Sequence, residues 1–260
     1  MKKSFLFFVG FVLALNFLSR ASAEVDLAQM PNLSLIQTAA VMEIMQELAK
    51  PGNKALLLCG GDIVKKAQKG ESKHKLTPEC RSELNRIITK DMQSNVPKIS
   101  DLAIKITKRS KTNMDKVQAI HKWVTHNIQY DVETYTDLVK NKKIFENPLQ
   151  LISPVVTLET KTAVAEGYSL LTAALLRAVN IPVVTIIGIA LRDGQPQGPH
   201  AWNEAYVENR WINVDTTWDA GGTTGNFEQG LVFVSRPTKK HFDMPDSEFK
   251  KSHRAALDIK

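Results

Sequence analysis

Residues 165–179 constrain the fold of this chain more than any other segment. Apolar side chains recur at every turn, at Leu170, Leu171, Ala174, Leu175 and Val179. So little polar face remains that the segment predicts a helix buried at the centre of a domain. Segments rich in β-branched residues follow at 182–189, 201–207, 210–214 and 230–234. This order predicts an α+β fold in which a central helix packs on an antiparallel sheet.

The first residues have the organisation of a secretory signal peptide. Lys2 and Lys3 precede an apolar run at 5–18, and Ala21-Ser22-Ala23 forms a small-residue cleavage site. The alternative is an uncleaved membrane anchor, but a spanning helix needs roughly 20 apolar residues. We therefore expect cleavage after residue 23 and export to a periplasmic or extracellular location, with no transmembrane helix in the mature chain.

The charge balance argues against a nucleic-acid partner. The chain has 34 Lys and Arg against 27 Asp and Glu, and three of the bases lie in the predicted signal peptide. The remaining 31 bases against 27 acids give a net charge of +4. Nucleic-acid binding calls for clustered basic stripes, which this mild excess does not provide.

Two cysteines, Cys59 and Cys80, remain after the predicted cleavage. In an exported protein such a pair suggests a disulfide, which would close a loop of about 20 residues and contribute about 3 kcal/mol. Two buried thiols are the alternative, because a disulfide also requires Cα atoms within roughly 7 Å. The sequence leaves both interpretations open.

Residues 24–111 predict an N-terminal helical region without a chemical motif. Helices are expected at 36–48 and 54–69, and a third begins at Thr77-Pro78-Glu79. A further helix begins at Thr112 or Asn113, with a buried face of Val117, Ile120, Trp123, Val124 and Ile128. Two prolines, Pro148 and Pro154, interrupt residues 130–160, for which we expect a long connection.

Residues 200–219 predict a hairpin that turns at Glu208-Asn209. If Val207 faces Arg210, Asp215 lies opposite Trp202, and Thr217 lies opposite His200. One face then carries His200, Trp202, Asp215 and Thr217, whereas the other is apolar. A carboxylate beside an imidazole is the orienting half of a catalytic triad. A purely structural hydrogen bond between the two side chains is the alternative.

The motifs resemble a known family. His200-Ala-Trp-Asn-Glu and Trp211-Ile-Asn-Val-Asp-Thr-Thr-Trp-Asp are similar to the His and Asp motifs of the transglutaminase-like superfamily of papain-like cysteine enzymes. The branch that includes kyphoscoliosis peptidase and cytokinesis-associated transglutaminase-like proteins is particularly similar. Upstream, Ile128-Gln-Tyr-Asp and Glu166-Gly-Tyr-Ser-Leu-Leu fit the same pattern. The resemblance covers residues 112–245 and leaves 246–260 as a C-terminal tail.

One departure from the family pattern bears directly on function. The superfamily carries Gly-Val-Cys-x-Gly-Tyr, whose cysteine begins the central helix, where the helix dipole and the histidine favour the thiolate. Here the same stretch is Ala163-Val-Ala165-Glu-Gly-Tyr168. A methyl group cannot act as a nucleophile, so the resemblance implies that this chain does not use covalent catalysis at Ala165.

The resemblance therefore implies a pseudoenzyme of the cell envelope or exterior that binds a peptide, protein or cell-wall ligand. His200 and Asp215 would be a vestigial dyad, and Tyr168, Trp202 and Trp218 would line the binding site. We expect no cofactor. We also expect no metal site, because His121 and His126 are five residues apart and diverge on a helix.

Two alternatives remain open. One is an active cysteine-protease-like or transglutaminase-like hydrolase or acyltransferase with a displaced nucleophile, such as Ser169. The other is a structural protein whose functional surface is formed by the N-terminal helices.

Overall fold

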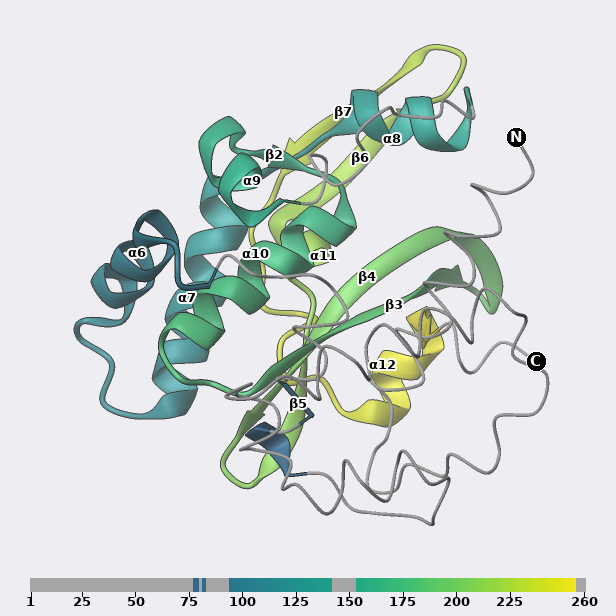
Figure 1. The fold of residues 1–260 in the computed structure, drawn as a ribbon. Coiled ribbons are helices and arrows are strands. Elements are labelled where there is room, and N and C mark those ends of the chain that lie inside the picture. Colours follow the sequence, from purple (N-terminus) through teal and green to yellow (C-terminus); the bar gives the residue numbers. More distant parts are fainter. Residues whose placement is uncertain (1–76, 80, 83–93, 142–152, 256–260) are drawn as a thin grey trace, which may run out of the picture. The chain divides into compact units, whose positions relative to one another are not determined.

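The computed structural model describes residues 77–79, 81, 82, 94–141 and 153–255 (Figure 1). The predicted signal peptide, the helices expected at 36–48 and 54–69, and both cysteines lie outside the described residues. Pro78 and Glu79 are helical, as expected for the third N-terminal helix. None of the described helices is long and apolar enough to cross a bilayer.

Residues Asp91–Arg254 belong to one compact unit. Its first described helix, α6 (Pro97–Thr107), packs against α7 (Asn113–Asn127) and buries Ile99 and Ala103. Near the C-terminal end of this unit, α12 (Asp246–Ser252) packs against strand β3 (Val183–Arg192). The predicted domain boundaries, 112–245 for the transglutaminase-like part and 246–260 for the tail, stay predictions. The compact unit also includes α6, which precedes residue 112, and α12, which follows residue 245.

The helix expected from Thr112 or Asn113 is confirmed as α7, and its cap is Thr112. The Thr112 hydroxyl accepts a hydrogen bond from the Asp115 backbone N–H, and the Asp115 carboxylate accepts one from the Thr112 N–H, both at 3.0 Å. This reciprocal pair satisfies two backbone donors that the first turn of a helix leaves free.

The long connection expected over residues 130–160 is wrong, because α8 (Val132–Val139) and α9 (Pro154–Thr160) lie within it. Asp131 caps α8 by accepting the Thr134 N–H at 2.9 Å, and Ser153 caps α9 by accepting the Val156 N–H at 3.3 Å. Pro154 does not break a helix, because it occupies the first turn, where its missing N–H costs nothing. Two short strands flank these helices in the sequence and pair with each other in parallel: β1 (Gln129–Tyr130) and β2 (Thr162–Ala163).

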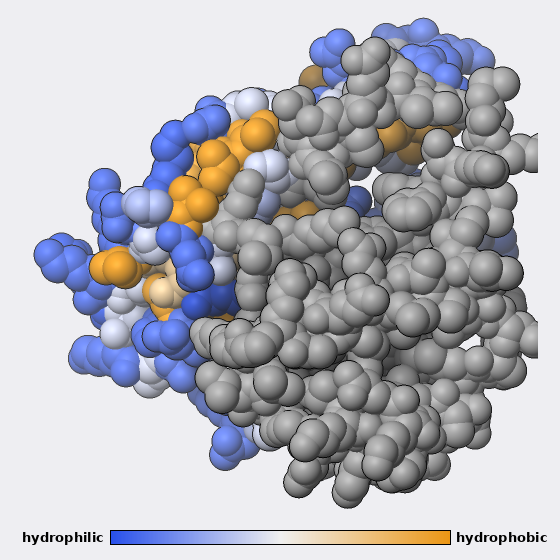
Figure 2. All heavy atoms as spheres, in the orientation of Figure 1, coloured by the Kyte–Doolittle hydropathy of each residue, from blue (hydrophilic) through white to orange (hydrophobic). Residues whose placement is uncertain are grey.

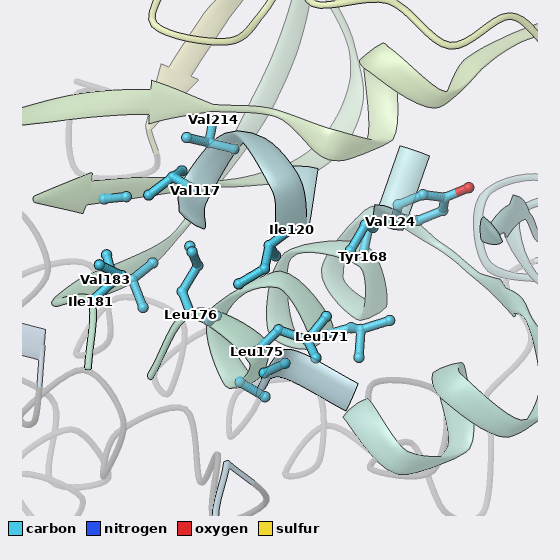
Figure 3. Packing of buried hydrophobic residues seen from close by; sticks show 14 of the residues in the cluster. Val117, Ile120, Val124, Tyr168, Leu171, Leu175, Leu176, Ile181, Val183 and Val214 are labelled. Atoms are coloured by element: carbon cyan, nitrogen blue, oxygen red, sulfur yellow. The ribbon is translucent and has the colours of Figure 1, made fainter. Parts of the chain in front are cut away.

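The buried central helix is confirmed as α10 (Ala165–Ala178). It contacts α6, α7 and α9, and also strands β3 and β4 of the sheet. Figure 3 shows Leu171, Leu175 and Leu176 of α10 packed among apolar side chains of α7 and the sheet. All three leucines are fully buried, and each such burial contributes about 1.5–3 kcal/mol.

The main sheet has the strand order β5-β4-β3-β8, from β3 (Val183–Arg192), β4 (Gln195–Val207), β5 (Arg210–Val214) and β8 (His253–Ala255). Strands β3, β4 and β5 are antiparallel neighbours. A separate hairpin of β6 (Gly221–Asn226) and β7 (Gly230–Ser235) follows the short helix α11 (Thr216–Ala220). The fold is therefore α+β, as the sequence predicted.

The β4–β5 hairpin confirms part of the predicted register. Val207 pairs with Arg210, and the turn residues Glu208 and Asn209 have φ of 51° and 61°. However, β5 ends at Val214, so the position predicted for Thr217, opposite His200, is wrong. Thr217 lies in α11 because the Asp215 carboxylate accepts its backbone N–H at 2.9 Å and caps a helix there.

The described residues expose few large apolar side chains. In Figure 2, hydrophilic side chains predominate over α6, with small apolar areas between them. The exposed large apolar side chains among the described residues come from different elements: Ile104, Leu138 and Val232.

Candidate functional site

The predicted pair of His200 and Asp215 lies at the end of the hairpin. His200 projects from β4, and Asp215 is the residue at which β5 ends and α11 begins. The Nε2 atom of His200 is 2.7 Å from the Oδ2 atom of Asp215, and both side chains are almost completely buried. The structure thus brings together the imidazole and the carboxylate that the hairpin pattern placed on one face.

The second oxygen of Asp215 fixes the carboxylate in place. Its Oδ1 atom accepts the backbone N–H groups of Thr217 at 2.9 Å and Trp218 at 3.1 Å. Burial alone would oppose ionisation, but the charge of His200 and the hydrogen bonds from two histidines outweigh it and hold the pKa of Asp215 well below its usual range. An ionised, immobile carboxylate of this kind orients an imidazole.

The second of these histidines, His253, was missed by the sequence analysis. Its Nε2 atom is 3.0 Å from the same Oδ2 atom of Asp215. It follows α12 and begins β8, in the segment that the sequence analysis assigned to a tail. Burial lowers the pKa of His253, although the hydrogen bond to Asp215 opposes that effect. No local pattern marks this histidine, because only the docking of α12 and β8 brings it to the site.

Aromatic rings enclose the histidines. Trp218 stacks on His200 with ring centroids 4.9 Å apart and lies 4.5 Å from His253. Trp202 makes edge contacts with His253 at 5.1 Å and Phe249 at 5.8 Å. Trp202 is 2% exposed, whereas Trp218 is half-buried. Of the two tryptophans predicted to line a binding site, Trp218 is the one with an exposed portion.

Tyr168 has the environment of a core residue. It lies one turn into α10, is fully buried, and donates its hydroxyl hydrogen to the Ile128 carbonyl at 2.6 Å. Burial also raises the pKa of Tyr168 far above its usual value. This hydrogen bond links the central helix to the end of α7. Ligand binding by Tyr168 and Trp202 stays a prediction.

Ala165 is the first residue of α10, as expected for the nucleophile position of the family. Its side chain is a buried methyl group. The first turns of α10 are tied to the sheet near His200, because the Asn203 amide donates to the Ser169 carbonyl at 3.0 Å. The amide groups at the start of a helix carry partial positive charge, which would favour an anion at this position.

Ser169, the candidate displaced nucleophile, is turned toward its own helix. Its hydroxyl donates to the Glu166 carbonyl at 2.9 Å, and the residue is 1% exposed. The hydroxyl hydrogen is therefore used by the backbone. In this arrangement the imidazole of His200 does not receive it.

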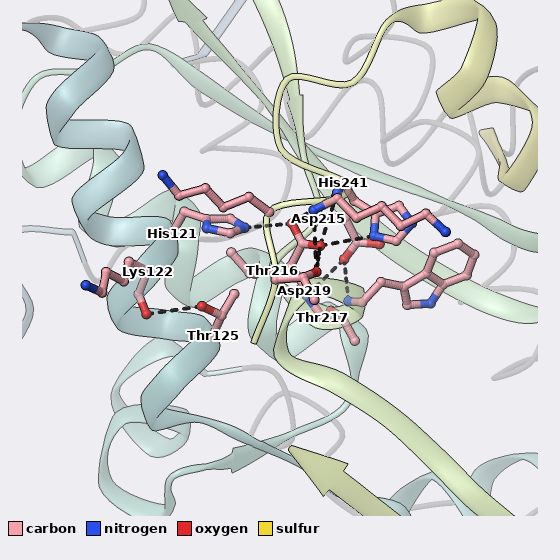
Figure 4. Close-up of polar contacts among 12 residues, drawn as sticks. His121, Lys122, Thr125, Asp215, Thr216, Thr217, Asp219 and His241 are labelled. Carbon is pink, nitrogen blue, oxygen red and sulfur yellow. Dashed lines mark hydrogen bonds and ion pairs between the residues drawn. The ribbon is translucent and has the colours of Figure 1, made fainter. Parts of the chain in front are cut away.

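A second cluster of histidines surrounds Asp219, four residues after Asp215 (Figure 4). The Oδ2 atom of Asp219 lies 2.9 Å from His121 Nε2, whereas its Oδ1 atom lies 3.1 Å from His241 Nδ1 and accepts the Thr238 hydroxyl at 2.7 Å. Burial again opposes ionisation, but these hydrogen bonds lower the pKa of Asp219. His121 is thus part of a clamp between α7, α11 and residues 238–241.

Comparison with known proteins identifies related sequences. The family model described as Transglutaminase-like superfamily matches residues 100–216, which include Ala165, His200 and Asp215. Kyphoscoliosis peptidase of Mus musculus is 29% identical over 166 residues, which are 58% of this chain and 23% of the mouse protein. Kyphoscoliosis peptidase of Homo sapiens is 28% identical over 130 residues, which are 47% of this chain and 18% of the human protein.

The chain thus spans less than a quarter of the length of these curated relatives. A solved structure described as a TGase has 22% sequence identity and a TM-score of 0.40, covering 66% of this chain and 45% of the other. The family model, the curated relatives and the α+β fold lead to one assignment: the chain contains a transglutaminase-like domain of this superfamily.

Proposed function

We propose that this chain is an exported, catalytically inactive transglutaminase-like protein that binds a peptide, protein or cell-wall ligand. The observation that carries the proposal is a retained His200–Asp215 pair, 2.7 Å apart, in a domain whose central helix begins with Ala165. The imidazole has its orienting carboxylate, but the helix start offers only a methyl group.

Loss of catalysis follows from the chemistry of these residues. A methyl group has no lone pair and no proton that His200 could remove, so an acyl-enzyme cannot form on Ala165. The first two hydroxyls along α10 are both used, because Tyr168 donates to the Ile128 carbonyl and Ser169 to the Glu166 carbonyl. An activated nucleophile must lie within hydrogen-bond reach of a base that removes its proton.

Ligand binding is supported by Trp218. This side chain stacks on His200 and keeps part of its surface exposed beside the start of α11. Tryptophan combines a large apolar surface with an N–H donor, which suits it to contacts with peptides. The name peptidase carried by the two curated relatives supports a peptide as the first ligand class to examine. Export is supported by the predicted signal peptide at residues 1–23.

An active acyltransferase or hydrolase is the second candidate. It is favoured by the ionised, immobilised Asp215 beside His200, since a purely binding domain has no need of an oriented imidazole. It requires a nucleophile from elsewhere in the chain.

One paired assay separates the two candidates. The chain and its Ala163→Gly, Ala165→Cys double variant are tested for peptide hydrolysis and amine incorporation, together with a thiol-reactive probe. We expect an inert wild type and a reactive double variant. Activity of the wild type would contradict the proposal and favour a displaced nucleophile.

Binding is tested with an immobilised peptide library and with purified peptidoglycan. We expect saturable binding to one of these probes and at least a tenfold loss of affinity on Trp218→Ala, about 1.4 kcal/mol. Trp211→Ala is the matched control, because Trp211 lies on β5 against Tyr206. Equal losses in both variants, or no binding to either probe, would contradict the binding proposal.

A further inference from the structure

Three buried side chains from separate parts of the chain converge at Asp215. His200 comes from β4, Asp215 from the start of α11, and His253 from the start of β8. One ligand atom from each, two imidazole nitrogens and one carboxylate oxygen, lies within 4.8 Å of the others. We propose that His200, Asp215 and His253 form a binding site for a divalent transition-metal ion, best matched by Zn²⁺.

The donor set and its spacing suit zinc. Imidazole nitrogen and carboxylate oxygen are both common zinc ligands. Ligand atoms about 2.0–2.2 Å from one tetrahedral zinc ion lie about 3.3–3.6 Å from one another. Nε2 of His200 and Nε2 of His253 lie 2.7 Å and 3.0 Å from Oδ2 of Asp215. Small adjustments of the side chains would therefore place one ion among the three atoms.

Neighbouring groups hold the Nδ1 side of the His253 ring in place. Its Nδ1 atom lies 3.2 Å from the Phe249 carbonyl and 2.9 Å from the Ser252 hydroxyl. The Ser252 hydroxyl also lies 3.2 Å from that carbonyl, so the ring orientation is fixed by contacts within its own segment.

The Nε2 atom on the other side of the ring lies 3.0 Å from the Asp215 carboxylate oxygen. A metal ion bound here would take the place of the proton between these two atoms. A backbone carbonyl at the second ring nitrogen is the usual outer support of a metal-binding histidine.

Thr217 gives a second, independent indication. Its hydroxyl oxygen is buried and has no hydrogen-bond partner among the described residues, although its backbone N–H donates to Oδ1 of Asp215. Buried polar groups without partners are uncommon and point to an unrecorded water or ion. Zinc sites with three protein ligands keep a fourth position for water. A water on the ion would give this hydroxyl a partner.

The cluster at Asp219 contrasts with this site. Asp219 divides its histidines between two oxygens and also accepts the Thr238 hydroxyl and the His241 backbone N–H. Among the described residues, only His200, Asp215 and His253 bring three candidate ligand atoms within 4.8 Å of one another. The proposal accordingly concerns the Asp215 cluster alone.

The test is zinc binding by the full chain. Protein stripped with a chelator is titrated with ZnCl₂, and bound zinc is measured by elemental analysis after desalting. We expect about one zinc ion per chain. His253→Ala should weaken binding by more than about 100-fold, and Ser252→Ala, which removes a supporting contact, by about 10-fold. His126→Ala is the matched control, because His126 is exposed and lies outside the cluster.

Zinc K-edge absorption of the wild type keeps the test decisive if His253→Ala does not fold. It should show two imidazole ligands and an oxygen-rich remainder, with no sulfur. Sulfur ligands would overturn the proposal by assigning the metal to Cys59 and Cys80. A wild type without stoichiometric zinc, or equal affinity in a folded His253→Ala variant, would overturn it as well. None of these outcomes depends on ligand binding at Trp218, so this proposal can fail separately from the proposed function.

Discussion

Two buried aspartates, four residues apart on the same helical turn, each hold two histidines, yet the two clusters differ in how the carboxylate is used. Asp215 presents one oxygen to both His200 and His253 and gives the other to the backbone of α11. Asp219 spreads its partners over both oxygens, toward α7 and toward residues 238–241. The same residue types therefore orient a functional group in one place and clamp distant segments together in the other.

The largest loss of stability is expected from a substitution in the Asp219 cluster. Asp219→Ala leaves the buried His121 and His241 without their acceptor and also removes the partner of the Thr238 hydroxyl. Removing one member of a buried charged network costs about 3–5 kcal/mol. Urea unfolding measures this loss in the free energy of unfolding.

Asp243→Ala is the control for that substitution, because its ion pair with Arg210 is partly exposed and should contribute at most about 1 kcal/mol. A loss for Asp219→Ala no larger than that of the control would show that this cluster does not clamp the fold.

A functional difference between the clusters is expected in the reactivated protein. With Ala163→Gly and Ala165→Cys in place, Asp215→Asn should reduce peptide hydrolysis about 100-fold, because the imidazole loses its orienting carboxylate. Asparagine still caps α11, which separates this effect from unfolding. Steady-state kinetics in metal-free buffer measures it, and an equal loss on Asp219→Asn would remove the distinction between the two sites.

Acid should reduce the stability that each of the two aspartates contributes. The pKa of Asp219 is lowered from an ordinary value of 3.8, so the stability it contributes is fully present above about pH 5 and is lost as the pH falls through its folded pKa. The difference in unfolding free energy between wild type and Asp219→Asn should therefore shrink by about 2 kcal/mol between pH 6 and pH 2. Unfolding titrations across this range test the expectation, which a constant difference would contradict.

The smallest effects come from two threonines, one in each cluster. Thr238→Val removes a hydroxyl that donates to Asp219 at 2.7 Å and should cost about 1 kcal/mol. Thr217→Val in metal-free protein removes a buried hydroxyl without a partner among the described residues, so we expect a change of about zero or a slight gain in stability. Thermal unfolding of the two variants side by side measures the difference. A larger loss for Thr217→Val would mean that its hydroxyl has a partner in solution.

Several predictions came from local patterns and are confirmed in the structure. The apolar run after Ala165 gave the central helix, and Glu208-Asn209 gave the hairpin turn. The hairpin in turn brought His200 to Asp215. These features depend on residues close in sequence, where side-chain periodicity and turn preferences act directly.

The errors arose where side chains cap helices or where distant segments dock. Asp131 and Ser153 cap two helices in a region expected to be a connection, and Asp215 diverts the chain into α11 before Thr217 can pair with His200. Single capping hydrogen bonds of this kind compete with the extended chain and leave only a weak trace in the sequence.

The sequence by itself determined the α+β class, the central helix and the pairing of His200 with Asp215, because helical and strand periodicities record which face of each element is buried. Only the tertiary structure decided that His253 shares the carboxylate of Asp215 and that His121 binds Asp219. These contacts join residues 38 and 98 positions apart, and such pairs are set by how whole elements pack rather than by any local pattern.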